Sequence, residues 1–304
     1  MKIIVGTRGS NLALTQTKWV VSQLQNNYPN TEFEIKTITT TGDRIQNVSL
    51  DKIGEKGVFV KEIEEQLLSG EIDLAVHSMK DMPGELPEGL MFSWVPERED
   101  YRDVIVLKGG YKSLKDLPKG AVIGTGSKRR QFQLSKYRED LKFDSIRGNI
   151  ETRVRKIEDQ NLHGVILAAA GLKRIGLYEK LRNRIEPIEA RIILPSPAQG
   201  ILAIEIREEN TQIHKMIESI NHSESFLQAT AERSFLKGLN GNCHIPMGAL
   251  CAIKGENIEI EGLLGNEDGS VLIKRKAYGP KEDAEKLGWE LAKDILKEMK
   301  GYEG

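Results

Sequence analysis

Apolar runs that break abruptly into polar residues recur along this chain, and they predict alternating strands and helices. The clearest run covers residues 74–76, which we expect to form a buried strand, with Lys80, Asp81 and Pro83 in the turn beyond its carboxyl end. Open α/β sheets bind their ligands at that end of the strands. A lysine beside an aspartate there could bind an anion and move a proton, although an exposed ion pair explains the two residues equally well.

A similar break follows the first predicted strand, over residues 3–7. Ser10 or Asn11 can cap a helix whose apolar residues recur at helical spacing as far as Leu24. The free amides of that helix start, the Ser10 hydroxyl and the Arg8 guanidinium form a group suited to binding an anion. The alternative is a capping serine beside a solvated arginine.

A polar segment over residues 43–57 follows the second predicted strand, over residues 33–38. Loops of this length usually carry a function or are disordered. The glycines of this segment could hinge a lid over Lys80 and Asp81. Phe59, at the start of the next predicted helix, is more often a core residue than a ring that stacks on a ligand.

The same alternation recurs between residues 103 and 174. Strands are predicted over 103–107 and 164–170, residues 121–127 are interpreted as a strand entering a glycine-rich turn, and another strand ends near residue 144. The cations that follow these strands are Arg129, Arg130, Arg147 and Arg174. One such residue would be a solvated charge, but four at strand exits favour a shared anion pocket.

The proline-rich linker 194–200 precedes another predicted strand, over residues 201–206. Because the second unit is complete by then, we expect this strand to return to the first lobe. Such a double crossover is the hinge of two-lobed binding proteins, and it places Gln199 at the lobe boundary. From residue 211 onward, two helices, three strands and a final helix predict a small α+β domain.

The predicted fold class is therefore α/β, with two lobes like those of periplasmic binding proteins, a double crossover hinge and a small α+β C-terminal domain. The predicted boundaries are 1–97 with 199–217 for the first domain, 98–198 for the second and 218–304 for the third.

The amino-acid composition and charge argue against nucleic-acid binding and membrane insertion. The 304 residues are 39% hydrophobic and 29% charged, which is typical of a globular protein. The 44 Lys and Arg residues balance 45 Asp and Glu residues, so no global field favours nucleic acid or an anionic membrane. The short apolar start does not indicate a signal peptide, and no apolar run approaches a membrane span. We expect a cytoplasmic protein.

Cys243 and Cys251 are the only cysteines, too few for a disulfide framework and without metal-ligand spacing. No metal is expected. Cys251 lies within a predicted strand and is interpreted as a small core residue. Cys243 lies in a predicted turn, where an accessible thiol could hold a covalent intermediate or cofactor. A lone loop cysteine is more often inert.

Nine motifs occur in one order along the chain: TRGSNLA at 7–13, GEKGVFVKE at 54–62, AVHSMKD at 75–81, ERED at 97–100, GTGSKRR at 124–130, RGN at 147–149, AAGLKR at 169–174, QG at 199–200, and Cys243. In that order, and over nearly the whole chain, they resemble the porphobilinogen deaminase family. The chain departs from the usual family pattern at Gly126, where a second serine is common, at Pro197-Ala198, where Val-Gly is common, and at Asn242, where a glycine is common.

The resemblance implies a transferase that joins four porphobilinogen molecules head to tail, loses ammonia each time and releases linear hydroxymethylbilane for haem and related tetrapyrroles. It further implies a monomer that carries one dipyrromethane cofactor, built from the substrate itself and held by a thioether at Cys243.

Each pyrrole unit bears an acetate and a propionate, which cations and hydroxyls can bind. The substrate- and cofactor-binding residues implied by the resemblance are Arg8, Ser10, Ser78, Lys80, Thr125, Ser127, Arg129, Arg130, Arg147, Gly148, Arg153, Arg174 and Gln199. Asp43, Lys56 and Phe59 are implied as secondary residues of the lid. Loss of ammonia leaves an electron-poor azafulvene, and the pyrrole carbon that attacks it must later lose a proton. Asp81 can stabilise the cation and act as general acid and base.

Two other functions explain part of the sequence pattern. A non-catalytic binding protein for an organic anion explains the two lobes and the arginines, but it predicts a secretion signal and has no use for a loop cysteine. Nucleic-acid binding through residues 128–130 is disfavoured by the balanced charge.

Overall fold

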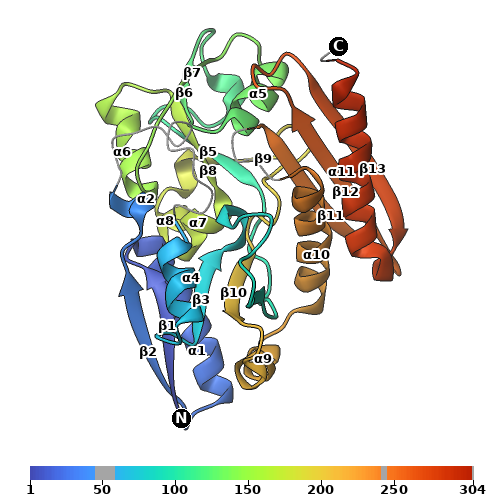
Figure 1. Cartoon of the computed structure of the whole chain (residues 1–304). Coiled ribbons are helices and arrows are strands. Elements are labelled where there is room, and N and C mark those ends of the chain that lie inside the picture. Colours follow the sequence, from blue (N-terminus) through green and yellow to red (C-terminus); the bar gives the residue numbers. More distant parts are fainter. Residues whose placement is uncertain (45–58, 241–244, 303–304) are drawn as a thin grey trace. The chain divides into compact units, whose positions relative to one another are not determined.

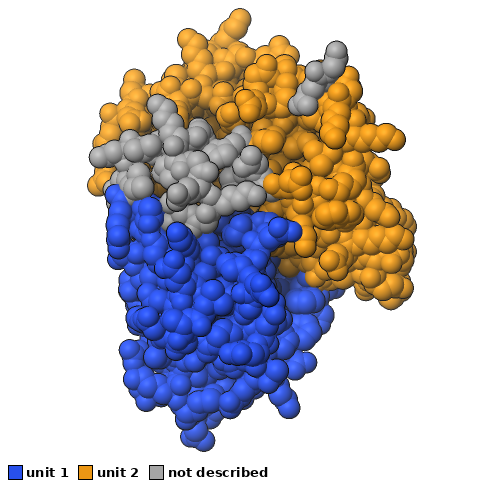
Figure 2. Space-filling model, in the orientation of Figure 1, with its two compact units in different colours: residues 1–98, 201–226 blue, residues 99–200, 227–304 orange. Residues whose placement is uncertain are grey.

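The computed structural model describes residues 1–44, 59–240 and 245–302. These residues form two compact units: residues 1–98 with 201–226, and residues 99–200 with 227–304 (Figure 2). The chain leaves the first unit after residue 98 and returns to it after residue 200, as a double crossover requires. The predicted division into three domains remains a prediction.

The first unit contains a five-stranded sheet with the order β2-β1-β3-β10-β4 (Figure 1). Its strands in chain order are β1 (Lys2–Arg8), β2 (Glu32–Ile38), β3 (Leu74–Ser78), β4 (Leu90–Phe92) and β10 (Leu202–Arg207). β1 runs parallel to β2 and β3, whereas β10 runs antiparallel to β3 and β4. The predicted return of the strand after the linker to the first lobe is therefore confirmed.

Helices cover both faces of this sheet. They are α1 (Asn11–Asn27), α2 (Thr41–Arg44), α4 (Lys61–Leu68) and α9 (Thr211–Glu218), with a 3-10 turn at Met79–Asp81. On one face, Val20 and Leu24 of α1 pack with Ile213 of α9. On the other, Ile63 and Leu67 of α4 pack with Ala75. Alternation along β3 thus contributes to one core on each face of the sheet, and the apolar residues of β10 join the first of these cores.

The second unit contains a five-stranded sheet with the order β7-β6-β8-β5-β9. Its strands are β5 (Asp103–Leu107), β6 (Val122–Gly124), β7 (Lys142–Asp144), β8 (Gly164–Ala168) and β9 (Ile185–Ile188). β6 is parallel to β7 and β8, and β5 is antiparallel to β8 and β9. The helices are α5 (Lys128–Tyr137), α6 (Ile150–Asp159), α7 (Ala169–Arg174) and α8 (Leu177–Lys180), with 3-10 turns at Leu114–Asp116 and Arg182–Arg184.

One predicted strand is too long. The strand expected over residues 164–170 ends at Ala168, and Ala169 begins α7. Alanine is apolar, so it continues a strand-like run, but it is also the best helix former. β4 and β9 were not predicted, because β4 has only three residues and β9 is an edge strand that contains Pro187.

The C-terminal part of the second unit has its own antiparallel sheet, β11-β12-β13. Its elements are α10 (Ser223–Gly238), β11 (Met247–Lys254), β12 (Asn257–Gly265), β13 (Leu272–Pro280), a 3-10 turn (Lys281–Asp283) and α11 (Ala284–Lys300). Phe235 of α10 and Ile295 of α11 are fully buried in one core with Ile260 of β12. The α/β class, the two sheet-containing lobes and the small C-terminal α+β part are confirmed.

Candidate active site

The carboxyl edge of the first sheet carries Asp81 and Lys80. β3 ends at Ser78 and continues directly into the 3-10 turn Met79–Asp81. The buried Met79 and Met82 fix this turn on both sides, and the Met79 amide donates to the Ile201 carbonyl over 3.0 Å. Asp81 is exposed, and it makes no ion pair with a described residue. The fold thus presents one carboxylate to solvent on a firmly held turn.

Ser78 and Arg8 lie at the same edge, because β1 and β3 are parallel. The Gln16 amide donates to the Ser78 hydroxyl over 3.0 Å. Ser10 is the N-cap of α1 and accepts from the Ala13 amide over 3.2 Å. The capping role predicted for Ser10 is therefore confirmed.

Arg8 is engaged on two sides. Its guanidinium donates to both carboxylate oxygens of Asp43, and it lies 4.4 Å from the centre of the Phe59 ring. Thr40 donates its hydroxyl to Asp43 over 2.8 Å. Burial alone would raise the pKa of Asp43, but the hydrogen bonds from Arg8 and Thr40 outweigh it and hold the pKa below its ordinary value. Asp43 is therefore ionised at neutral pH, and its charge balances that of Arg8.

The second unit brings three strand exits together. Since β6 is parallel to both β7 and β8, their carboxyl ends share one edge of the sheet. A Cβ atom on Gly126 would lie 3.1 Å from the Ile146 carbonyl, so the turns after β6 and β7 touch. Thr125 is buried, and its hydroxyl accepts from the Ser127 amide over 3.2 Å. Ser127 caps α5 by accepting from the Arg130 amide.

Arg129 and Arg130, in the first turn of α5, are buried and converge on Asp103. Arg129 Nη1 donates to Asp103 Oδ2 over 2.8 Å, and Arg130 donates to Oδ1 from Nε and Nη2 over 3.0 and 2.7 Å. Burial alone would raise the pKa of Asp103, but the two guanidiniums outweigh it and hold the pKa far below its usual range. Sequence reasoning did not single out Asp103, whose only signal is an aspartate that opens an apolar strand.

Gln199 and Arg174 lie near this cluster in the hydrogen-bond network. Gln199 is fully buried, and its amide donates to Asp103 Oδ1 over 3.0 Å and to the Tyr101 carbonyl over 2.8 Å. Arg174 donates to the Gly200 carbonyl over 2.7 Å. Burial lowers the pKa of Arg174 to about 10, so it is still a cation at neutral pH.

The turn after β7 supplies the remaining implied residues of this unit. Gly148 has a φ of +111°, which favours glycine. Arg153 donates from Nε to the Gly148 carbonyl over 2.8 Å, and Asn149 caps α6. Arg147 and Arg153 are both partly exposed. Lys56 and Cys243 lie outside the described residues, whereas Cys251 is buried in β11, as predicted.

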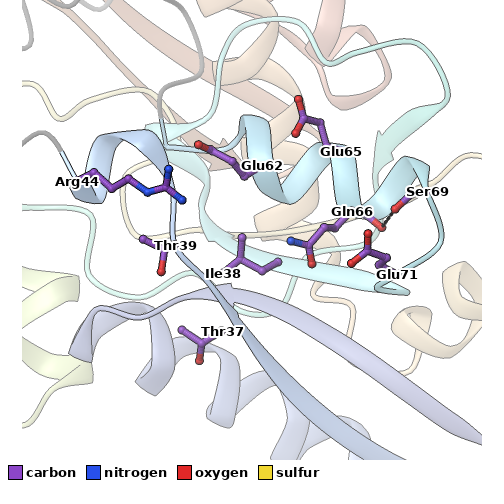
Figure 3. A pocket seen from close by; sticks show the side chains of 9 residues that line it. All are labelled: Thr37, Ile38, Thr39, Arg44, Glu62, Glu65, Gln66, Ser69 and Glu71. Carbon is purple, nitrogen blue, oxygen red and sulfur yellow. Dashed lines mark hydrogen bonds between the residues drawn. The ribbon is translucent and has the colours of Figure 1, made fainter.

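A cavity of about 550 Å³ in the first unit is chemically different from these edges (Figure 3). It lies between β2 and α4, and Figure 3 shows the side chains of Glu62, Glu65 and Glu71 along it, with Arg44 at one end. Its acidic lining does not suit a substrate rich in carboxylates.

The described residues contain neither a metal-binding cluster nor a membrane-spanning helix. Across residues 1–44, 59–240 and 245–302, no group of three or more His, Cys, Asp or Glu side chains is placed to hold a metal ion. No helix within the same ranges is long and apolar enough to cross a membrane.

Comparison with known proteins gives one consistent result. The family model "Porphobilinogen deaminase, dipyromethane cofactor binding domain" matches residues 3–215, and "Porphobilinogen deaminase, C-terminal domain" matches residues 226–297. Porphobilinogen deaminase of Clostridium novyi is 58% identical over 98% of this chain and 100% of its own length. That of Clostridioides difficile is 54% identical over the full length of both chains. Among solved structures, the periplasmic VFT2 domain of Bordetella pertussis BvgS has 15% identity and a TM-score of 0.43, covering 77% of this chain and 92% of its own.

Proposed function

This chain belongs to the porphobilinogen deaminase family, and we propose which of its side chains carry the family's reaction. The enzyme assembles porphobilinogen into the linear tetrapyrrole hydroxymethylbilane with release of ammonia, and it uses a dipyrromethane cofactor. The division into three domains, residues 1–97 with 199–217, 98–198 and 218–304, is part of the same proposal.

The observation that carries the assignment is that each five-stranded sheet gathers cations at one edge. In the first unit this edge holds Arg8 and Lys80, and in the second it holds Arg129, Arg130 and Arg147. Acetate and propionate groups of pyrroles pair with guanidinium and ammonium groups. We assign these cations, with Arg153 and Arg174, to binding carboxylates, and Ser10, Ser78, Thr125, Ser127, Gly148 and Gln199 to supporting hydrogen bonds.

The second unit fits the cofactor chemically. Its buried guanidiniums Arg129 and Arg130 face a single carboxylate among the described residues, so one positive charge is left for a bound carboxylate. When bound, the dipyrromethane supplies the pyrrole carbon to which the first substrate is joined. Attachment to Cys243 is inferred from the family motif, and the separate sheet β11–β13 supports a third domain that carries this residue.

We assign general acid and base catalysis to Asp81. The departing amine needs a proton, the cation that remains needs a nearby negative charge, and the attacking pyrrole carbon must later give up a proton. An exposed carboxylate held between Met79 and Met82 can serve all three needs without a large movement. Asp43 and Phe59 orient Arg8 and are assigned, with Lys56, a secondary role.

The test is the variant Asp81→Ala. We expect kcat to fall by about 10²- to 10⁴-fold, because proton transfer loses its group, while binding of porphobilinogen changes little. Stopped-flow release of ammonia and equilibrium binding of substrate measure the two quantities. Glu88→Ala is the matched control, since Glu88 is an exposed acid of the same unit and should keep full activity. Near-normal turnover of Asp81→Ala would reject Asp81 as the catalytic group.

We further propose that the enzyme works as a monomer in the cytoplasm, with porphobilinogen and no nucleic acid or membrane as partner. The family resemblance supports the monomer, and the balanced charge and scarce cysteines support the compartment and the absence of a nucleic-acid partner.

A further inference from the structure

Asp103 is the buried centre of the cluster that contains Arg129 and Arg130. It is the first residue of β5, where its backbone pairs with Ala168, the last residue of β8. Asp103 therefore lies at the edge of the sheet where β8 ends. Its side chain is 0% exposed, and three side chains donate to it: Arg129, Arg130 and Gln199.

The charges in this cluster do not balance. Two guanidiniums, 7% and 8% exposed, share one carboxylate. Within the described part of the chain, the other acceptors of Arg129 and Arg130 are backbone carbonyls, those of Leu194 and Ile166 at 2.6 and 3.1 Å. A buried charge without a counter-ion is costly. Asp103 neutralises one of the two charges, and the second has no carboxylate partner among the described residues.

The two arginines differ in how many of their guanidinium donors have an acceptor among the described residues. Arg130 donates from all three nitrogens, to Asp103 and to the Ile166 carbonyl, so its plane is fixed on three sides. Arg129 donates from Nη1 only, to Asp103 and the Leu194 carbonyl. The Nε and Nη2 donors of Arg129 have no acceptor among the described residues. These two donors form the fork that binds a carboxylate in a bidentate manner.

We propose that Asp103 is a positioning residue for the reaction: it fixes the guanidinium planes of Arg129 and Arg130 and leaves the outer fork of Arg129, with one net positive charge, for a single pyrrole carboxylate. This inference rests on the proposed function, which assigns both arginines to carboxylate binding. Gln199 adds a neutral donor to Asp103 and so supports its position without changing the charge.

The test is a double-mutant cycle on cofactor loading, with Asp103→Asn, Arg129→Gln and the double variant. Each protein is prepared without cofactor and incubated with porphobilinogen, and intact mass gives the substrate concentration at half loading. We expect Asp103→Asn alone to raise the half-loading concentration about tenfold or more. In a protein that already carries Arg129→Gln, the same change should raise that concentration by less than about threefold, because Asp103 acts through Arg129. A purely structural role would make the two effects multiply.

Loss of an ion pair as such is controlled at a second arginine–aspartate pair of the same unit. Arg138 and Asp140 form a bidentate, partly exposed pair with contacts of 2.8 and 2.7 Å, so Asp140→Asn removes an ion pair away from the cluster and should leave loading unchanged. If Asp103→Asn does not fold, Gln199→Met keeps every charge and removes the hydrogen bonds from the Gln199 amide to Asp103 and to the Tyr101 carbonyl. It should raise the half-loading concentration about threefold, with no further effect beside Arg129→Gln.

The outcomes separate the two proposals. The positioning role would be overturned if Asp103→Asn loads as well as the unaltered protein. It would also be overturned if the effect of Asp103→Asn or Gln199→Met on the half-loading concentration multiplies with that of Arg129→Gln. Failure of the unaltered protein to load at all would instead contradict the proposed function.

Discussion

The two cationic sheet edges differ in how many arginines pair with each carboxylate. Arg8 is matched by one carboxylate, Asp43, whereas Arg129 and Arg130 share Asp103. On the proposed function, a substrate carboxylate at Arg8 must share it with Asp43 or displace Asp43, while the second unit holds a buried excess charge from the start. Because buried ion pairs are screened little by salt, this difference should persist at physiological ionic strength.

Glu64 offers a test of buried electrostatics at the residue scale. It is 8% exposed on α4, and burial, followed by the charges of Glu205 and Glu65, raises its pKa to about 7. The folded chain therefore holds a proton that the unfolded chain, with the ordinary pKa of 4.5, gives up earlier. This contribution to stability is fully present below pH 4.5 and is lost as the pH rises through 7.

We expect Glu64→Gln to stabilise the first unit at pH 8, by at most about 3 kcal/mol, and to have little effect at pH 4. The buried pair of His77 and Glu205, 3.0 Å apart, remains in both proteins. Hydrogen exchange of the β3 amides measures the opening free energy of this unit alone. Glu88→Gln, on an exposed position, is the control. A stability gain of the same size at both pH values would contradict the assignment.

At the scale of elements, α10 and α11 pack so closely that one glycine is required. A Cβ atom on Gly288 of α11 would lie 2.1 Å from the Ala231 carbonyl oxygen of α10. Because the neighbouring atom is backbone, it cannot move aside as a flexible side chain would. We expect Gly288→Ala to destabilise the C-terminal part of the second unit by about 1–3 kcal/mol.

Thermal unfolding followed by tryptophan fluorescence, to which Trp289 next to Gly288 contributes, reports this change. Gly109→Ala is the control, since a Cβ atom on Gly109 meets nothing within 4 Å. Equal melting temperatures for Gly288→Ala and the unaltered protein would show that the two helices are not packed in this way.

Much of the element pattern could be predicted from the sequence, because apolar periodicity and capping residues are local signals. The strand over 103–107 was predicted with its observed bounds, and Ser10 was a predicted cap. Ala169 was assigned to a strand, since an apolar run alone does not distinguish a strand from a helix. The left-handed φ of +59° at Ala198 was also not predictable, although the usual family glycine at this position suits such a backbone.

The candidate site was predictable only in part. The sequence indicates which cations follow strands, but it does not tell which of them already have a partner. Asp103 lies 26 residues from Arg129 and 96 residues from Gln199, so only the folded sheet joins them. The pairing of Arg8 with Asp43, 35 residues apart, could not be predicted from the sequence for the same reason.

At the scale of the whole molecule, the overall charge gives no hint of an anionic substrate. The formal net charge is −1, yet each five-stranded sheet places cations at one edge. On the proposed function, these local cations rather than the net charge select the carboxylate-rich substrate, and we expect the balanced remainder to reduce non-specific binding of other polyanions.

The central claim, a dipyrromethane joined covalently to Cys243, is tested most directly by the intact mass of the purified protein. We expect a mass above that of the sequence by one dipyrromethane, loss of this increment in Cys243→Ser, and its retention in Cys251→Ser, whose thiol is buried in β11. An active protein with the mass of its sequence alone, or an increment that persists in Cys243→Ser, would contradict the account.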